Sequence, residues 1–297
     1  MQVDRKLKQE LMEKISDFYD SVPVYSIKKL SNNEIIDNAK YYASRFMGGN
    51  SPATFKSIEK HDDLMLINLP WDTKMWVYNN SNAITITRRM KPLEHLINEN
   101  IDVSRLGLIA IEKMKKLKMD KWKLSFEELK FESLGQIKAF GINVQETRSP
   151  SILCRIIGVF RRYINEIPVY GRASISLKIA GGDILESIGV DWRLIEEHPV
   201  EYTKIIDVEI AAENIINELN STSPSRILTL DDYSPILFTL AYMSMPKRRP
   251  QNYMQPVYIA IFKPLRNTTL GHVITIPAAT KNYESIQIPP TETKFGG

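Results

Sequence analysis

The feature that most constrains the fold is an alternation of apolar and polar residues on both sides of a glycine pair. From Ser174 to Ile179 every second residue is apolar, which is the two-residue period of a half-buried strand. The segment 180–183, with sequence AGGD, then reverses the chain, because glycine accepts the positive φ of a tight turn. The alternation resumes from Ile188 to Trp192. The stretch therefore predicts an antiparallel hairpin.

Four segments carry the three-to-four-residue apolar spacing of helices. Ser31 is followed three residues later by Glu34, a capping box that predicts the start of one helix, and Gly48 and Gly49 end it. Asp207 is placed as an N-cap for another helix. The expected helices cover about 4–19, 31–46, 102–117 and 207–219. Pro23 is expected to end the first segment.

Strand patterns follow each of the last three helices. The expected strands cover about 64–67, 75–78, 84–87, 122–131, 137–146, 151–164, 172–179, 184–194, 227–230, 236–243, 256–262 and 273–276. This order, without strand–helix alternation, predicts an α+β fold of repeated units, each with one helix packed on a curved antiparallel sheet. The expected division is an N-terminal helix (1–23), three units (24–92, 93–200 and 201–280) and a tail (281–297).

Composition excludes some classes of protein. The chain has 297 residues, of which 43% are hydrophobic and 25% charged, which is ordinary for a globular protein. The net charge of +4 comes from 39 basic and 35 acidic residues with both signs interspersed, so nucleic acid is not an expected partner. Cys154 is the single cysteine, so no intramolecular disulfide can form.

The sequence does not fix a compartment. No apolar run approaches the roughly 18–20 residues of a membrane span. The N-terminal residues 1–15 lack the apolar core of a signal peptide. Two localisations therefore stay open: the cytoplasm, or the bacterial cell envelope with a leader or anchor absent from this sequence. The oligomeric state cannot be predicted.

Motifs for known chemistries are missing from the sequence. It contains no nucleophile elbow, P-loop, dinucleotide fingerprint or zincin motif. The four histidines are scattered, so no local zinc spacing exists, and His61-Asp62-Asp63 is expected to be a turn rather than a metal site. Cys154 lies among apolar residues and is expected to be buried and dispensable. We expect no cofactor and no metal.

Two basic stretches allow a functional and a structural interpretation. The lysines of 113–123 surround Trp122, and they are interpreted as a solvated helix C-terminus rather than an anion or membrane-surface patch. The segment Lys247-Arg248-Arg249 lies between two prolines and is expected to be an exposed loop. It could contact an acidic partner or serve solubility alone.

Aromatic and arginine side chains gather around the central hairpin. These two residue types dominate binding hot spots, because they bury large surfaces. A sheet also exposes alternate residues on its open face, where such side chains could line a groove. The expected binding residues are Arg161, Arg162, Tyr170, Arg172, Trp192 and Arg193. The same residues could also be structural.

The hairpin and its approach resemble the propeptide-type modules called PepSY and FTP (fungalysin/thermolysin propeptide), including two-domain regulators of the YycI type. The matching residues are Asn165–Gly171 (NEIPVYG), Gly182-Asp183-Ile184 and Trp192-Arg193, with Glu166 where the family usually has glycine. Gln255–Tyr258 and Ile276–Ala278 resemble the end of such a module.

The resemblance implies a cystatin-like fold, a helix clasped by a curved antiparallel sheet, repeated along the chain. It also implies a non-enzymatic role, in which the protein binds, inhibits or chaperones another protein or peptide. The implied partner is a peptidase or a sensor protein, often at the bacterial cell envelope.

Two functions from different classes therefore stay open. The first is a regulatory module that binds a polypeptide through the central hairpin. The second is a small-molecule isomerase or cyclase with an acid–base pair in a pocket of a cone-shaped α+β fold. The candidate residues for this second function are Glu186, Asp191, Tyr170 and His198. A pocket that holds a carboxyl group of raised pKa would favour the enzyme.

Overall fold

The structure is a computed structural model. It describes residues 5–15, 17–49, 53–91, 93–97, 103–117, 128–142, 148–221, 229–265, 270–284 and 291–294. The protein is α+β, with four helices in these ranges and a large, mostly antiparallel sheet. The chain splits into two compact units. The central unit comprises Lys28–Leu194 and Ser244–Pro250, and the terminal unit comprises Met1–Ile27, Ile195–Met243 and Gln251–Gly297.

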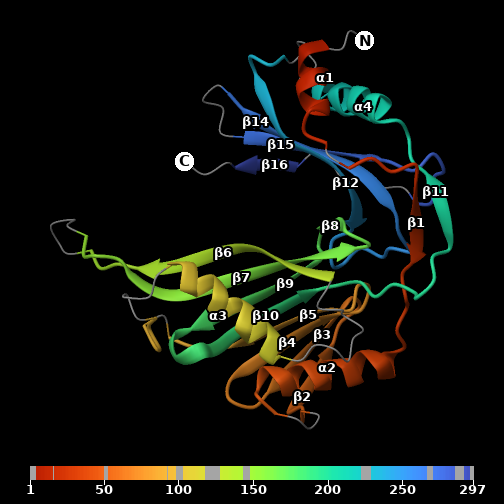
Figure 1. Cartoon of the computed structure of the whole chain (residues 1–297). Coiled ribbons are helices and arrows are strands. Elements are labelled where there is room, and N and C mark those ends of the chain that lie inside the picture. The colour runs from red at the N-terminus through yellow and green to blue at the C-terminus, as the bar shows by residue number, and fades with distance from the viewer. Residues whose placement is uncertain are drawn as a thin grey trace. The chain divides into compact units, whose positions relative to one another are not determined.

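The central unit contains helices on one face of an antiparallel sheet (Figure 1). Its helices are α2 (Asn32–Phe46) and α3 (Val103–Lys116). Its strands are β2 (Ser57–Lys60), β3 (Leu64–Leu69), β4 (Thr73–Tyr78), β5 (Ala83–Arg88), β6 (Leu129–Ala139), β7 (Ile152–Ile164), β8 (Ile167–Gly171), β9 (Ser174–Ala180) and β10 (Ile184–Asp191). They are ordered β2-β3-β4-β5-β10-β9-β7-β6, and β8 pairs with the end of β7.

The capping residues of α2 explain where this helix begins and ends. The Ser31 hydroxyl accepts the N–H of Glu34 at 3.3 Å, while the Glu34 carboxylate accepts the N–H of Ser31 at 2.8 Å. At the other end Gly48 adopts φ +79°, and the N–H of Gly49 reaches the carbonyl of Ser44 at 2.9 Å. This is the glycine-terminated helix end that the sequence predicted.

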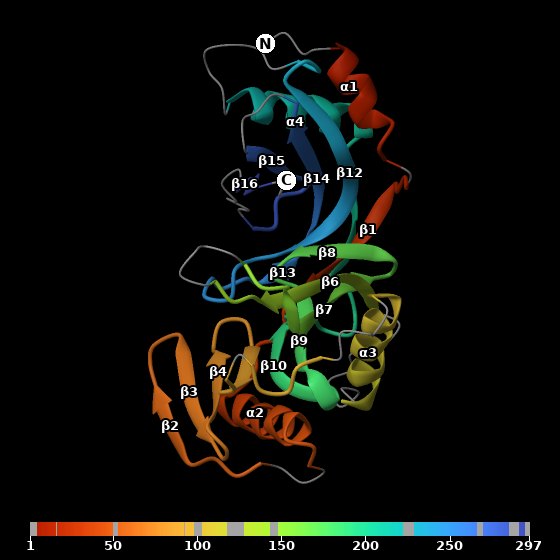
Figure 2. The same cartoon turned by 90° about the vertical axis from the view of Figure 1, so that its left-hand side faces the viewer.

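Both helices bury their apolar faces against the same face of the sheet. Tyr42 and Ala39 of α2, Leu106 and Ala110 of α3, and Phe160 of β7 belong to one hydrophobic core. Figure 2, turned by 90° from Figure 1, shows α2 and α3 beside the strands that they cover. The alternation from Ser174 to Ile179 follows from this layer structure, because only one face of the sheet meets the helices.

The turn in the central hairpin has the predicted backbone. Gly181–Asp183 form a short 3₁₀ turn in which Gly182 adopts φ +70°. A side chain at Gly181 would place its Cβ 2.0 Å from the carbonyl oxygen of Leu96. The first glycine is therefore needed for a close backbone approach and the second for its dihedral angle.

The terminal unit has helices α1 (Arg5–Met12) and α4 (Val208–Ser221), which pack side by side. One sheet has the order β11 (Glu201–Lys204), β1 (Ser21–Ser26) and β13 (Tyr253–Met254). The other strands follow the order β16 (Thr291–Lys294), β15 (Leu270–Pro277), β14 (Pro256–Pro264) and β12 (Tyr233–Ser244). Asp207 caps α4, since its carboxylate accepts the N–H of Glu209 at 2.7 Å.

Several local predictions are wrong. The first helix ends at Met12 rather than near residue 19, and Phe18, within the expected helix, is 70% exposed. Helix α1 packs against α4 with Leu7 and Leu11 buried, and after it the chain continues to β1, which contains Pro23. Residues 229–230, expected in a strand, lie at a turn that Asp232 closes by accepting the N–H of Thr229.

Strand β6 runs without a break across residues 132–136, the gap between the two strands that were expected at 122–131 and 137–146. It continues through Gly135 because it pairs with β7 along its length. Residues 118–127 and 143–147 lie outside the described ranges. The sequence missed the short strands β1, β2, β8, β11, β13 and β16.

The sequence placed 24–92 and 93–200 in separate units, whereas β5 and β10 pair in one antiparallel ladder, with Ile86 opposite Ile188. Strands from these two segments therefore share one sheet. The division of the chain into five segments stays a prediction.

Replacing Gly158 with alanine should lower the free energy of unfolding by about 1–3 kcal/mol, because α3 approaches β7 closely there. The new Cβ would lie 2.5 Å from the Cβ of Ala110. The matched control is Gly135→Ala, whose Cβ would lie 3.5 Å from Ile157 and should change stability by less than about 1 kcal/mol. Urea unfolding measures both. Equal losses of stability in Gly158→Ala and Gly135→Ala would show that the packing of α3 on β7 does not require glycine at position 158.

Candidate functional site

The face of the central sheet that points away from the helices presents two kinds of side chain. In the middle of the sheet, β5, β9 and β10 place small residues on this open face, among them Thr85, Ser176 and Gly189. Toward the β7 side, larger residues such as Arg161 and Tyr163 take their place. The aromatic and arginine side chains of this face and of the central hairpin are the candidate binding site.

The structure divides the six predicted binding residues into two groups. Arg161 and Tyr170 are half-buried and Arg172 is exposed. Arg162, Trp192 and Arg193 are buried, with exposed fractions of 4%, 3% and 2%. Only the first group is accessible to a partner in this conformation. Whether the six residues form a binding site stays a prediction.

A cluster of stacked cations and rings lies on β6, β7 and β8. The Cζ of Arg161 lies 4.3 Å from the ring centroid of Tyr170. The Arg161 guanidinium also donates to the carbonyl of Val169 at 3.1 Å and forms an ion pair with Glu132. It is thus held on three sides, which fixes its orientation at a half-exposed position.

A second stack stands beside the first, because Lys130 of β6 pairs with Arg161 of β7 in the ladder. The Nζ of Lys130 lies 4.2 Å from the ring centroid of Tyr163 and 2.6 Å from a carboxylate oxygen of Glu166. We call the two stacks together the Arg161 patch. It consists of Lys130, Glu132, Arg161, Tyr163, Glu166 and Tyr170.

Two side chains of the Arg161 patch, Tyr170 and Lys130, have pKa values above their usual values. Burial raises the pKa of Tyr170, and the nearby charge of Arg161 offsets this only in part. The hydrogen bond to Glu166 raises the pKa of Lys130 above its usual value. Both shifts keep the protons in place near neutral pH, so the patch offers a neutral phenol and two cations to a partner.

Arg162 and Trp192 form a buried stack. The Cζ of Arg162 lies 4.3 Å from the Trp192 ring, and its guanidinium donates to the carbonyl of Arg193 at 2.7 Å and to Glu128 at 3.1 Å. Trp192 belongs to the core that α2 and α3 cover. These contacts give both residues a structural role.

Arg193 holds together segments that are far apart in sequence. Its guanidinium donates to the carbonyl of Asn80 at 2.8 Å, of Pro246 at 3.1 Å and of Arg249 at 2.7 Å. It also reaches the carbonyl of Met245 at 3.4 Å. Arginine suits this position because its planar group presents several donors in fixed directions. The residue fastens the segment Ser244–Pro250 to the turn between β4 and β5.

Lys247 and Asp191 form an ion pair at the end of the open face. The Nζ of Lys247 lies 2.8 Å from a carboxylate oxygen of Asp191, 3.3 Å from the Thr85 hydroxyl and 5.1 Å from the Tyr78 ring centroid. Arg172 lies 4.0 Å from the same carboxylate. The loop predicted at 247–249 is exposed at Arg248 and Arg249, but Lys247 is half-buried on the sheet.

Glu186 lies between two cations. Its carboxylate forms an ion pair with the buried Arg155 and accepts a hydrogen bond from Lys178 at 2.6 Å. Burial raises the pKa of Glu186, but the bonds from Lys178 and Arg155 outweigh it, so the pKa lies below its usual value. Such a carboxylate stays ionised at neutral pH and is a poor proton shuttle.

The remaining candidates are placed as follows. His198 is exposed and belongs to the terminal unit, whereas Glu186, Asp191 and Tyr170 belong to the central unit. Cys154 is 2% exposed, which confirms its predicted burial. Its dispensability stays a prediction.

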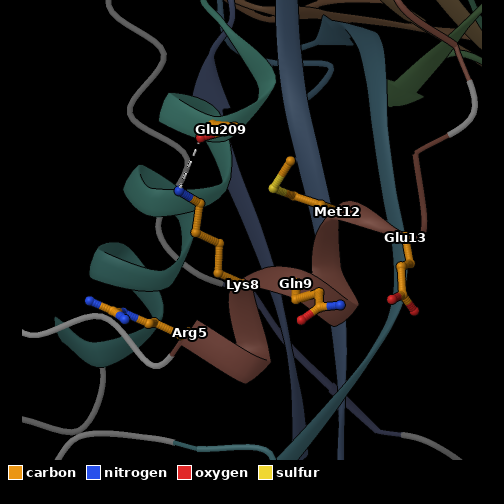
Figure 3. Close-up of a pocket in the computed structure, with 6 residues that line it drawn as sticks. All are labelled: Arg5, Lys8, Gln9, Met12, Glu13 and Glu209. Carbon is orange, nitrogen blue, oxygen red and sulfur yellow. Dashed lines mark ion pairs between the residues drawn. The ribbon is translucent and has the colours of Figure 1, made fainter.

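Two of the cavities that described residues line lie within single units. A cavity of about 170 Å³ in the central unit is mostly aliphatic, with Ile109, Ile156 and Ile179 in its walls. A pocket of about 430 Å³ in the terminal unit lies between α1 and α4 (Figure 3). There the Nζ of Lys8 lies 3.7 Å from Glu209, and Arg5 and Gln9 line the same pocket. Neither cavity contains the predicted acid–base residues.

Within the described ranges, no group of three or more His, Cys, Asp or Glu side chains could hold a metal ion. At the predicted turn, Asp63 instead pairs with Arg248 at 3.3 Å. No helix in the part of the chain that the structure describes is long and apolar enough to span a bilayer.

Comparisons with known proteins find similarity among solved structures and not among sequences. No protein-family model matches the chain, and no curated protein sequence matches it. Among solved structures, the chain is similar to the crystal structure of an uncharacterized protein from Eubacterium rectale. The two share 10% sequence identity, with 96% of this chain and 100% of that chain covered and a TM-score of 0.48.

Sequence reasoning missed Lys130, Glu132 and Glu166 as members of the Arg161 patch, and Lys247 as the partner of Asp191. The first set depends on the register of β6 against β7, which sequence does not reveal. The prolines at 246 and 250 did mark the second segment, but no local signal paired it with Asp191.

Proposed function

We propose that the protein is a non-enzymatic regulatory module that binds another polypeptide through the Arg161 patch. The similarity of the hairpin region to propeptide-type modules is part of this proposal, as is the repetition of cystatin-like units. The partner would be a protein or peptide, such as a peptidase or a sensor protein. The protein would inhibit, chaperone or regulate it.

The observation that carries the proposal is the stacking of the Arg161 guanidinium on the Tyr170 ring, in an orientation that other contacts of Arg161 fix. Arginine and tyrosine bury a large surface on binding, and they lose least entropy when their orientation is already fixed. Glu132 and the carbonyl of Val169 provide that fixation before any partner arrives. The half-exposed positions leave part of each side chain free for contact.

The alternative is a small-molecule isomerase or cyclase that uses Glu186, Asp191, Tyr170 or His198. A general acid or base works best with a pKa near the operating pH. The ion pairs of Glu186 lower its pKa instead, and Asp191 is engaged by Lys247. These contacts favour the binding function.

Replacing Arg161 or Tyr163 with alanine should weaken the partner complex by about 1–3 kcal/mol, or roughly 5-fold to 150-fold. The partner is obtained by capture from the native cell on the immobilised protein and identified. Its affinity for each purified variant is then measured by calorimetry.

The matched control is Arg248→Ala, an exposed arginine outside the Arg161 patch, which should leave the affinity unchanged. Thermal melts of each variant separate lost contacts from lost folding. Turnover of a small molecule that is abolished by Glu186→Gln or Asp191→Asn, in variants that keep their melting temperature, would establish the enzymatic function instead.

A further inference from the structure

Strand β6 is a long open edge of the central sheet. It extends over 11 residues and pairs with β7 on one side, while no described strand pairs with its other side. Every second residue of such an edge directs its N–H and C=O outward, unpaired by the sheet. Most side chains of β6 are exposed as well, so the edge is accessible.

The two edges of this sheet differ. The opposite edge, β2, has only 4 residues, and a short edge strand offers little to an incoming chain. β6 has irregular pairing near Glu132 and after Ile137, but from Ser133 to Ile137 it pairs regularly with β7. That regular stretch is long enough to direct the hydrogen bonds of an added strand.

Apolar side chains lie along β6 on the side of helix α3. Phe131 is 37% exposed, and its ring lies 3.7 Å from the Cβ position at Gly107 of α3. Leu134 is half-buried against the core, and Leu108 of α3 is 58% exposed. A strand added to β6 would cover the exposed parts of these side chains, as inner strands of the sheet do for the core.

We propose that an extended segment of the partner polypeptide adds to the open edge of β6 as a further strand. The segment carries apolar residues at alternate positions, which face α3, Phe131 and Leu134. It carries an acidic residue beside Lys138, which is exposed and forms no ion pair with another described residue. This inference rests on the proposed function, because Lys130 of the Arg161 patch belongs to β6 itself, so a partner at this edge also reaches the patch.

A partner segment fits this edge better than a second copy of the chain. Pairing β6 with its own copy around Gly135 would set Leu134 against Gln136 and Ser133 against Ile137. Apolar residues would then oppose polar ones on both faces, which cross-strand pairs disfavour. A foreign strand can instead match each face of the edge.

A random library of displayed 12-residue peptides, selected on the immobilised full-length protein, supplies the probe. The best peptide is synthesised, and each backbone nitrogen is N-methylated in turn. In strand addition, only alternate amides donate to β6, so every second N-methyl group should weaken binding about tenfold or more. The positions between them should tolerate the methyl group.

Two proline variants of β6 test the site on the protein. Gly135 and Gln136 are adjacent and exposed, and both lie in regular register with β7, so the N–H of only one of them points outward. Proline at the inward N–H removes a hydrogen bond to β7, whereas proline at the outward N–H does not. Of Gly135→Pro and Gln136→Pro, the variant with the higher melting temperature therefore carries proline at the outward position, and we call it the edge-blocked protein. It should bind the probe at least about tenfold more weakly than its alanine counterpart.

The outcomes separate this inference from the proposed function. Alternating N-methyl sensitivity together with loss of binding to the edge-blocked protein supports strand addition. Probes that lose affinity with Arg161→Ala but bind the edge-blocked protein normally overturn strand addition and leave the proposed function standing. A library that yields no binding peptide overturns strand addition, whereas the proposed function is overturned only if Arg161→Ala and Tyr163→Ala leave the affinity of the captured partner unchanged. A dimer in solution that the edge-blocked variant abolishes assigns the edge to a second copy and also overturns the inference.

Discussion

Replacing Arg193 with alanine should lower the free energy of unfolding of the central unit by about 3–5 kcal/mol. The guanidinium is buried and donates to the carbonyls of Asn80, Pro246 and Arg249, with Met245 at the edge of reach. Alanine leaves these acceptors without their donor and leaves a cavity as well. Urea unfolding followed by tryptophan fluorescence measures the loss.

The matched control for this prediction is Arg248→Ala in the same segment. Arg248 has an exposed side chain and one ion pair, with Asp63, so its removal should cost less than about 1 kcal/mol. Arg193→Lys adds a second comparison, because lysine keeps the charge but cannot reach carbonyls in several directions. If Arg193→Ala cost no more than Arg248→Ala, the carbonyl contacts would contribute nothing to stability.

Replacing Glu186 with alanine should cost about 3–5 kcal/mol, because it leaves the buried Arg155 without its carboxylate partner. Arg155 also donates to the carbonyls of Lys91 and Glu94 at 3.0 Å, so its guanidinium is held in place beside the vacated position. The control is Glu166→Ala, whose exposed ion pair with Lys130 should contribute less than about 1 kcal/mol.

Glu186 also predicts how stability depends on pH. Its folded-state pKa is lower than the ordinary value of 4.5, despite burial, because Lys178 and Arg155 bond to the carboxylate. The contribution is therefore present above the unfolded-state pKa and is lost as pH falls through the folded-state pKa. Wild-type protein should lose stability more steeply than Glu186→Gln below about pH 4.5. Parallel curves for the two proteins would contradict this linkage.

Much of the local structure could be predicted from short stretches of sequence. The box formed by Ser31 and Glu34 placed the start of α2, Gly48 placed its end, and Asp207 placed α4. The glycine pair at 181–182 placed the central turn. Each of these signals acts within a few residues, through a cap, a dihedral angle or a periodic apolar face, so sequence alone reports it.

The candidate site could be predicted only in part. The sequence gathered Arg161, Arg162, Tyr170 and Arg193 into one region, because arginines and aromatics cluster there. It could not separate them by exposure, since adjacent residues of a strand point to opposite faces and the helices cover only one of these faces. Arg161 and Arg162 show the consequence: the first is half-buried on the open face, and the second is buried on the core side.

The sequence by itself determined the α+β class, the main helices and the central hairpin, because local periodicity and turn chemistry carry that information. Only the tertiary structure decided that β10 pairs with β5, that Lys130 lies beside Arg161, and that Arg193 fastens the segment Ser244–Pro250. These contacts join residues far apart in the chain. Which of these long-range contacts form depends on strand register and on which faces of the sheet the helices cover, and no local sequence pattern encodes either one.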